Sequence, residues 1–301
     1  MLSSVLFTSC KKDDNPATTN TVTDIVLTNS NFTLLRAAVQ RAGLADQLRT
    51  GSITVFAPTD DAFKAAGYAD VAAINAAPVA DLTRILQYHV VGSRIPAANV
   101  PAAQNTAVQS LLTTNGTLYV SKINNTISVN GRTVTTADVA ADNGVVHVIN
   151  GVLIPPGGDV VATVIANPQS FSLLAQAVTR AGAGVVTALQ STTAATVFAP
   201  TNEAFIAAGL SSSAISAADP TVLARVLSYH VVPGRVFSTQ LTDGTTPATL
   251  LGPTVRINVA GTGVTVTGQG NGANASSVVS ANNLSTNAVI HVINRVLLPP
   301  P

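Results

Sequence analysis

The chain has 301 residues, a length typical of about two domains, and either half is long enough to bury a core of its own. Charged residues make up 10% of the chain, against roughly 25% in an ordinary soluble domain. The formal net charge is +1, so no broad field would steer the protein to nucleic acid or to acidic lipid. With no Trp and four Tyr, neither a base-stacking platform nor a Trp-lined sugar groove is expected.

Hydrophobic residues make up 47% of the chain and the mean hydropathy is +0.39, values that could suggest a membrane protein. Much of this content is alanine, however, and no uninterrupted apolar run approaches the ~18 residues of a spanning helix. We therefore expect a soluble body.

Cys10 is the single cysteine, so the fold contains no intrachain disulfide. The segment LFTSC that ends at Cys10 resembles the lipobox of a bacterial lipoprotein, which implies acylation of Cys10 and attachment to a lipid bilayer. The alternative is a chance cysteine in a disordered tail. Only nine residues precede Cys10 and none is basic, so we expect the natural leader to be longer.

The residues after Cys10 are polar. The segment Lys11–Asp14 resembles the charged tag that sends lipoproteins to the outer face of the cell in some Gram-negative lineages. From Asn15 to Thr23 the composition predicts a flexible tether. We therefore assign residues 1–21 to a lipoprotein signal and tether.

One unit of about 140 residues then occurs twice. The repeated segments are Thr54–Phe63 with Thr196–Phe205, Tyr88–Val91 with Tyr229–Val232, and His147–Pro156 with His291–Pro300. The offset between copies ranges from 139 (Phe32 to Phe171) to 144 (His147 to His291). Because order and spacing agree over the whole unit, chance similarity is excluded and insertions are expected only in loops.

The first part of each unit has helical periodicity. Apolar residues at helical spacing run from Phe32 to Ala42, and Gly43 follows at the position where glycine ends helices. The segment from Phe171 to Gly182 repeats this pattern.

A short buried strand and another helix come next. The strand over 54–57 is ended by Pro58, and Thr59 is a good N-cap for a helix whose first turn holds Asp60 and Asp61. A further helix is expected to end at Tyr88-His89, and its second copy opens with Asp219-Pro220, an N-cap followed by proline.

The second part of each unit predicts strands. Short β-favouring runs over 118–120, 126–129 and 133–134 are separated by Asn-Gly turns, and 255–259 and 264–267 take this part in the second copy. The runs 145–149 and 289–293 are expected to close each unit as a central strand. Helices first and strands later, without regular alternation, predict an α+β fold.

These motifs resemble the fasciclin-like domain, twice over. The resemblance covers residues 22–156 and 157–301 and implies, for each, a wedge or sandwich of β-strands packed with several short helices. The motif positions that carry it, for which we expect structural roles, are Thr54, Phe56, Pro58, Thr59, His147, Asn150, Thr196, Phe198, Pro200, Thr201, His291 and Asn294. Proteins with such domains are secreted or surface-anchored and mediate cell adhesion and matrix contacts, so the resemblance implies a binding function rather than an enzyme.

All four histidines lie in the repeated motifs. Their spacing matches no zinc pattern, and no cysteine joins them. By strand alternation His147 shares a face with Val145 and Ile149, so a buried, hydrogen-bonded imidazole is expected there and at His291.

The two Tyr-His pairs are the candidate partner-binding residues. Tyr88 and His89, with Tyr229 and His230, are expected to end a helix near the surface. In related domains this region is implicated in receptor contact, which leaves a partner-binding role open beside a structural one.

Two other features invite functional readings. Asp60-Asp61 could bind a cation, but the second copy has Asn202-Glu203, so a helix start is the better interpretation. The segment Gly268–Gly272 is glycine-rich, yet no helix pattern follows it, so we expect a flexible loop and no phosphate site. No catalytic motif, metal site or cofactor is predicted.

The sequence thus predicts an exported outer-membrane lipoprotein, exposed on the cell surface or, alternatively, periplasmic. The expected partners are a surface or matrix protein or a polysaccharide, besides the bilayer, with no nucleic acid and no small-molecule substrate. The alternative function is a structural or accessory role in envelope polysaccharide handling, which a deep polar cleft would favour.

Overall fold

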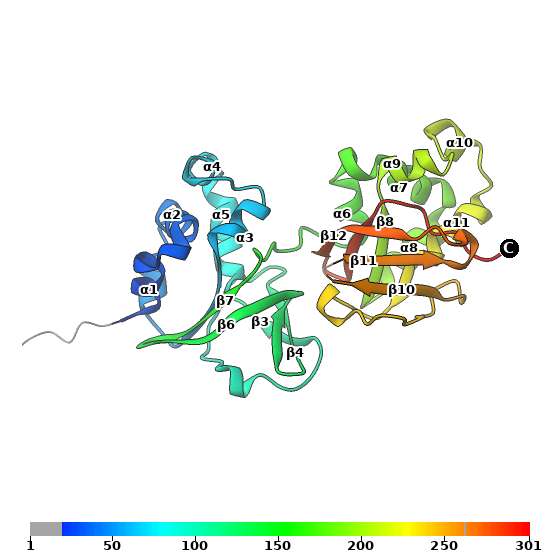
Figure 1. Cartoon of the computed structure of the whole chain (residues 1–301). Coiled ribbons are helices and arrows are strands. Elements are labelled where there is room, and N and C mark those ends of the chain that lie inside the picture. Colours follow the sequence, from blue (N-terminus) through cyan, green and yellow to red (C-terminus); the bar gives the residue numbers. More distant parts are fainter. Residues whose placement is uncertain (1–19, 262) are drawn as a thin grey trace, which may run out of the picture.

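The computed structural model describes residues 20–301 except residue 262 and contains two modules of like architecture, joined by a single passage of the chain (Figure 1). In each module several short helices lie against a mixed β-sheet. The predicted α+β fold in two tandem units is confirmed.

The first module runs from α1 to β7. Its helices are α1 (Val22–Thr28), α2 (Thr33–Ala42), α3 (Asp60–Ala65), α4 (Val71–Ala76) and α5 (Val79–Tyr88). Its strands are β1 (Ile53–Pro58), β2 (Val90–Val91), β3 (Thr106–Gln109), β4 (Thr117–Ile123), β5 (Thr126–Val129), β6 (Arg132–Ala141) and β7 (Gly144–Ile149). Short 3₁₀ turns include η3 (Ala97–Asn99).

Over its described residues the second module follows a similar order, with six helices and six strands against the five and seven of the first. Its helices are α6 (Val160–Ile165), α7 (Pro168–Ala181), α8 (Ala183–Ser191), α9 (Asn202–Ala207), α10 (Ser212–Ala217) and α11 (Pro220–Tyr229). Its strands are β8 (Ala195–Pro200), β9 (Val231–Pro233), β10 (Val255–Ala260), β11 (Gly263–Gly268), β12 (Ser276–Leu284) and β13 (Ala288–Ile293). The 3₁₀ turn η4 (Ser238–Gln240) corresponds to η3, and η5 (Gln269–Asn271) follows β11.

A parallel pair lies inside each sheet. The strand order is β2-β1-β7-β6-β5-β4-β3 in the first module and β10-β11-β12-β13-β8-β9 in the second. β1 pairs in parallel with β7, and β8 pairs in parallel with β13. β1 and β8 are buried along their whole length, as expected of apolar parallel strands that are covered on both faces.

Capping side chains start many of the helices at the positions that the sequence indicates. Thr59 Oγ1 accepts a hydrogen bond from Ala62 N at the start of α3, and Thr201 Oγ1 accepts one from Ala204 N at the start of α9. At the end of α2, Gly43 adopts a φ of 69°, a left-handed conformation that suits a glycine C-cap.

A bulge bends the long strand next to each parallel pair. The β6–β7 register shifts between Thr136 and Val139, and the β12–β13 register shifts between Ser280 and Asn283. Asp138 (φ 57°) and Asn282 (φ 64°) occupy the two bulges. Bulges bend a strand and increase its twist, which lets each sheet curl over its own core.

Each module therefore has two apolar clusters. In the first module one cluster lies between helices and sheet and includes Phe32, Leu35 and Phe63. The other lies inside the curled sheet and includes Tyr88 and Leu118. The second module has the same two clusters, so each module buries its own core.

Candidate functional site

The two Tyr-His pairs lie at the C-terminal ends of α5 and α11, as predicted, but they are buried. Tyr88 and Tyr229 are 0% exposed, His89 is 2% exposed and His230 is 3% exposed. The prediction that they lie near the surface is wrong, because curled-sheet strands and the segment after each last strand cover the end of the helix. In this conformation they offer no surface to a partner, and we assign them no direct partner contact.

Each of these histidines joins its helix to the chain segment that follows the last strand. His89 Nδ1 lies 2.7 Å from Ile85 O in α5, and His89 Nε2 accepts a hydrogen bond from Leu153 N at 2.9 Å. The backbone N–H must be the donor in the second bond, so the proton of the neutral ring lies on Nδ1. In the second module His230 makes the same bonds with Val226 O and Leu297 N, at 2.7 and 2.9 Å.

This environment disfavours the charged imidazolium. Burial lowers the pKa of His89 to about 4 and that of His230 to about 4, against the opposing effect of the hydrogen bond to the helix carbonyl. A second ring proton would also point at the N–H of Leu153 or Leu297. Both histidines are therefore neutral at pH 7.

The tyrosine hydroxyls form a second internal link. Tyr88 Oη donates to Thr117 O at 2.9 Å and accepts from Asn130 Nδ2 at 2.9 Å. Tyr229 Oη donates to Thr254 O at 2.7 Å and accepts from Gln269 N at 2.8 Å. The glycine-rich segment around Gln269 is thus fixed to the core, contrary to the flexible loop that its composition predicts.

His147 and His291 are buried and hydrogen-bonded, as expected. They are 1% and 0% exposed, and each lies beside the phenylalanine of the adjacent parallel strand, with ring centroids 5.7 Å apart. His147 Nε2 lies 2.9 Å from Ile95 O, and its Nδ1 accepts from Asp138 N at 3.3 Å. His291 Nε2 lies 3.0 Å from Val236 O, and burial lowers the pKa of His291.

The other motif residues make internal contacts. Thr54 Oγ1 donates to Ser93 O at 2.7 Å, and Thr196 Oγ1 donates to Gly234 O at 2.7 Å. Asn150 Oδ1 accepts from Thr133 N at 2.9 Å, and Asn294 Oδ1 accepts from Ser277 N at 2.8 Å. Phe56, Pro58, Phe198 and Pro200 are buried in the parallel strands.

Asp60 has a role that sequence reasoning missed. Besides lying in the first turn of α3, its Oδ1 accepts a hydrogen bond from Leu34 N at 2.7 Å, which ties α3 to the start of α2. Asn202 Oδ1 accepts from Leu173 N at 2.9 Å in the second module. An acceptor oxygen at this position, rather than a charge, is what both copies share.

Cys10 lies outside the described residues, and its acylation stays a prediction. Over residues 20–261 and 263–301, the structure has no group of three or more His, Cys, Asp or Glu side chains that could hold a metal ion. Across those residues no single helix is long and apolar enough to cross a membrane. The helices α7 and α8 together have the necessary length and apolar composition, but the chain bends by 110° between them.

Polar side chains connect the two modules. Gln240 Nε2 in η4 donates to Asn105 Oδ1 at 2.8 Å and to Ser121 Oγ at 2.9 Å. Asn105 Nδ2 donates to Arg235 O at 2.6 Å. The Arg235 guanidinium carbon lies 4.1 Å from the centroid of the Tyr119 ring, a cation–π contact across the same interface.

One interface bond depends on a difference between the two copies. Asp138 and Asn282 occupy equivalent bulges, and each side-chain oxygen accepts the first N–H of a 3₁₀ turn, from Ala97 and Ser238 respectively. Asn282 also has an amide group, and its Nδ2 donates to Gly131 O of the first module at 3.1 Å. An ionised aspartate has no hydrogen to donate, so the copy with asparagine is the one that faces the other module.

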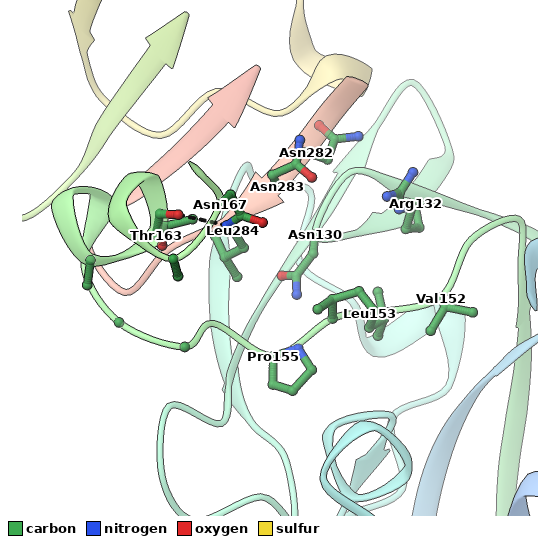
Figure 2. A pocket seen from close by; sticks show the side chains of 15 residues that line it. Asn130, Arg132, Val152, Leu153, Pro155, Thr163, Asn167, Asn282, Asn283 and Leu284 are labelled. Atoms are coloured by element: carbon green, nitrogen blue, oxygen red, sulfur yellow. Dashed lines mark hydrogen bonds between the residues drawn. The ribbon is translucent and has the colours of Figure 1, made fainter. Parts of the chain in front are cut away.

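A pocket of about 470 Å³ opens beside this interface. Residues from β6, from the passage between the modules, from α6 and from β12 line it (Figure 2). Its volume lies within the ~300–1,000 Å³ of typical ligand sites, which occur preferentially at domain interfaces. Sequence reasoning missed this pocket, because its lining comes from four segments that share no motif.

The fasciclin domain family matches this chain twice, over residues 30–155 and 169–299. A protein of Synechocystis sp., sll1483, is 41% identical over 139 residues, which cover 45% of this chain and 74% of that protein. Transforming growth factor-beta-induced protein ig-h3 of Sus scrofa is 40% identical over 45% of this chain and 19% of its own length. Human periostin is 27% identical over 86% of this chain and 30% of its own length, so the chain spans less than a third of these two relatives.

A solved structure, that of a domain pair from the insect cell adhesion molecule fasciclin I, matches 88% of this chain and 97% of its own with 19% identity and a TM-score of 0.44. The two family matches together cover most of the chain, each over one structural module. The chain belongs to the fasciclin domain family and contains two fasciclin domains in tandem.

Proposed function

We propose that this protein is an exported adhesion protein, held on the cell envelope by an acylated Cys10, that presents its two fasciclin domains to partners outside the membrane. The observation that carries the proposal is the polar interface between the domains. Hydrogen bonds from Gln240, Asn105 and Asn282 join them, so both domains can meet one partner as a single composite surface. Two linked sites raise avidity without a new type of contact when both can engage.

The expected partner is a surface or matrix protein or a polysaccharide. With 10% charged residues, the protein has little basis for recognition by strong electrostatic attraction. Its repeated motifs are used internally, as the burial of Tyr88, His89, Tyr229 and His230 illustrates. The partner-binding surface is therefore expected among exposed loops and strands rather than among the residues that the two copies share.

Acylation would give the chain its attachment. Each buried CH₂ group contributes about 0.8 kcal/mol of membrane affinity, and stable anchoring needs more than one acyl chain or a second signal. Bacterial lipoproteins carry several chains on the acylated cysteine. The residues between Cys10 and Asn20 would then connect the bilayer to the first domain.

Replacing Cys10 by Ala in the native host is expected to move the protein from the membrane fraction to the soluble or unprocessed pool. The substitution removes the sulfur that carries the lipid and touches neither domain. Ser9→Ala is the matched control, because it keeps a small residue before the cysteine and should leave the protein on the membrane. Immunoblots of fractionated cells give the readout, and a Cys10→Ala protein as firmly bound as wild type would refute the anchor.

Protease added to intact cells tests the outward orientation in the same strains. The wild-type protein is expected to be degraded while a periplasmic marker survives. Resistance in intact cells, with degradation after lysis, would contradict the adhesion role and indicate a periplasmic one.

The second candidate function is handling of envelope polysaccharide. It is favoured by the pocket between the domains, whose lining includes the polar side chains of Asn167, Asn283 and Arg132. The two candidates differ in where recognition occurs: on the outer surface of the domains for adhesion, and in the pocket for polysaccharide handling.

A further inference from the structure

We propose that the pocket between the two domains binds a carboxylated saccharide unit, such as a uronic acid, and that Arg132 holds its carboxylate. The inference names a ligand for the second candidate function and rests on it. Its test measures binding by purified protein, so a negative result would leave the location experiments on Cys10 unaffected.

Arg132 opens β6 and is the single charged side chain among the described residues that line the pocket. It is half-buried, and burial lowers the pKa of its guanidinium, which remains charged at neutral pH. Within the described part of the chain, its side chain makes no hydrogen bond and both ion pairs lie elsewhere, at Asp24–Arg49 and Asp61–Lys64. A guanidinium presents paired N–H donors that match the two oxygens of a carboxylate.

The second domain forms the equivalent strand without an arginine at this position. Asn150 and Asn294 make equivalent bonds to Thr133 and Ser277, which aligns Arg132 with Ser276 of the second domain. The stem of Arg132 lies over Gly151, where an added Cβ would come within 2.5 Å of Arg132 Cδ. The second domain has Ser276 at the position of Arg132 and Arg295 at the position of Gly151. Of these two equivalent sites, the one in the first domain, beside the pocket, is where an arginine lies over a glycine.

Two amide oxygens of the pocket are available for hydroxyl groups. Asn167 Nδ2 donates to Thr163 O at 2.7 Å and Asn283 Nδ2 donates to Ser280 Oγ at 3.1 Å, while neither Oδ1 accepts a hydrogen bond from a described residue. Asn130 and Asn282, in contrast, use both their oxygen and their nitrogen within the protein. Figure 2 shows Arg132 on one side of the pocket and Asn167 on the opposite side, with Asn283 between them.

The remaining lining is apolar. Leu153, Pro155 and Leu284 contribute to it. One cation, two free amide acceptors and apolar walls suit a ligand with one carboxylate, several hydroxyls and C–H faces. A saccharide acid has this combination, and the volume of about 470 Å³ is within the range of small-ligand sites.

Other anions fit less well. A phosphate dianion would meet a single cation among the described lining residues, which leaves half of its charge without a partner. A purely apolar ligand would cover Arg132 and leave its charge without a partner, which is costly. The chemistry therefore points to a monoanion that also bears hydroxyl groups.

Titration of the purified full chain with methyl glucuronide, followed by calorimetry, tests the proposal. Saturable binding with one site is expected, and Arg132→Ala should weaken it at least about tenfold, as expected for loss of a charge-assisted pair. Arg295→Ala is the matched control: it removes an exposed arginine at the position equivalent to Gly151 and should leave binding unchanged. The urea midpoint of each variant verifies that it is folded.

Methyl glucoside and acetate separate the parts of the ligand. Both are expected to bind at least about tenfold more weakly than methyl glucuronide, since each lacks one half of the recognised chemistry. Ala166→Trp, which adds bulk at the exposed end of α6 and keeps Arg132, should also weaken glucuronide binding.

Several outcomes would overturn the inference. Methyl glucoside that binds as tightly as methyl glucuronide would show that the protein does not recognise the carboxylate. Acetate that binds as tightly as methyl glucuronide would show a general anion site only. Glucuronide affinity unchanged in both Arg132→Ala and Ala166→Trp would place any binding outside the pocket, and no saturable binding of glucuronide would refute the site.

Discussion

Replacing His230 by Ala is expected to lower the free energy of unfolding of the second domain by about 3–5 kcal/mol. The substitution leaves the buried N–H of Leu297 without its acceptor, which costs about 1–3 kcal/mol. It also empties the volume of an imidazole in a side chain that is 3% exposed, and cavities of this kind add about 2 kcal/mol or more. His89→Ala should cost the first domain a similar amount, through Leu153.

Urea unfolding monitored by circular dichroism and by tyrosine fluorescence measures these losses. Arg225→Ala, an exposed substitution on the same helix α11, serves as the control and should change stability by no more than about 0.5 kcal/mol. If His230→Ala costs less than about 1 kcal/mol, the link between α11 and the segment after β13 contributes little, and the repeated Tyr-His motif needs another explanation.

Acidification from pH 7 to pH 4.5 is expected to destabilise both domains through their buried histidines. The folded-state pKa of about 4 at His89 and His230 lies below the unfolded value of about 6.5, so the unfolded chain binds more protons between these values. The resulting stability is fully present above pH 6.5 and is lost as pH falls toward 4. At 1.36 kcal/mol per pKa unit, the full loss amounts to about 3 kcal/mol for each histidine.

Urea midpoints at pH 7, 5.5 and 4.5 check this dependence. His230→Gln is the informative variant, since glutamine has an acceptor oxygen and a donor N–H but does not titrate in this range. It should reduce the pH dependence of the stability of the second domain and leave that of the first domain unchanged. Part of the pH dependence of the second domain should remain, because burial also lowers the pKa of His291. Equal midpoints at all three pH values in the wild-type protein would contradict neutral, buried histidines.

The repeated motifs predicted the elements close to the parallel strands correctly. Thr59 as an N-cap, the strand that ends at Pro58 and the buried His147 all follow from local rules of capping, strand alternation and polar burial. Each of these depends on neighbours within a few residues or on the identity of one apolar face. Such features recur in both copies because both cores need them.

Long-range packing could not be predicted in the same way. The sequence indicates that α5 ends at Tyr88-His89 but not that the curled sheet covers that end. The hydrogen bond from Asn282 to Gly131 joins residues 151 positions apart, and Asn282 differs from its counterpart Asp138 by a single functional group. Arg132 begins β6 directly after the Asn130-Gly131 turn and belongs to none of the repeated motifs. The sequence therefore did not indicate that it lines a pocket.

The adhesion role is tested most directly by binding of the purified, fluorescently labelled chain to intact cells and to isolated matrix from the culture that produces it. If the adhesion role is correct, we expect saturable binding that unlabelled protein displaces and that the chain unfolded by heat does not reproduce. Binding no greater than that of an unrelated protein of similar size and charge, to both cells and matrix, would contradict it.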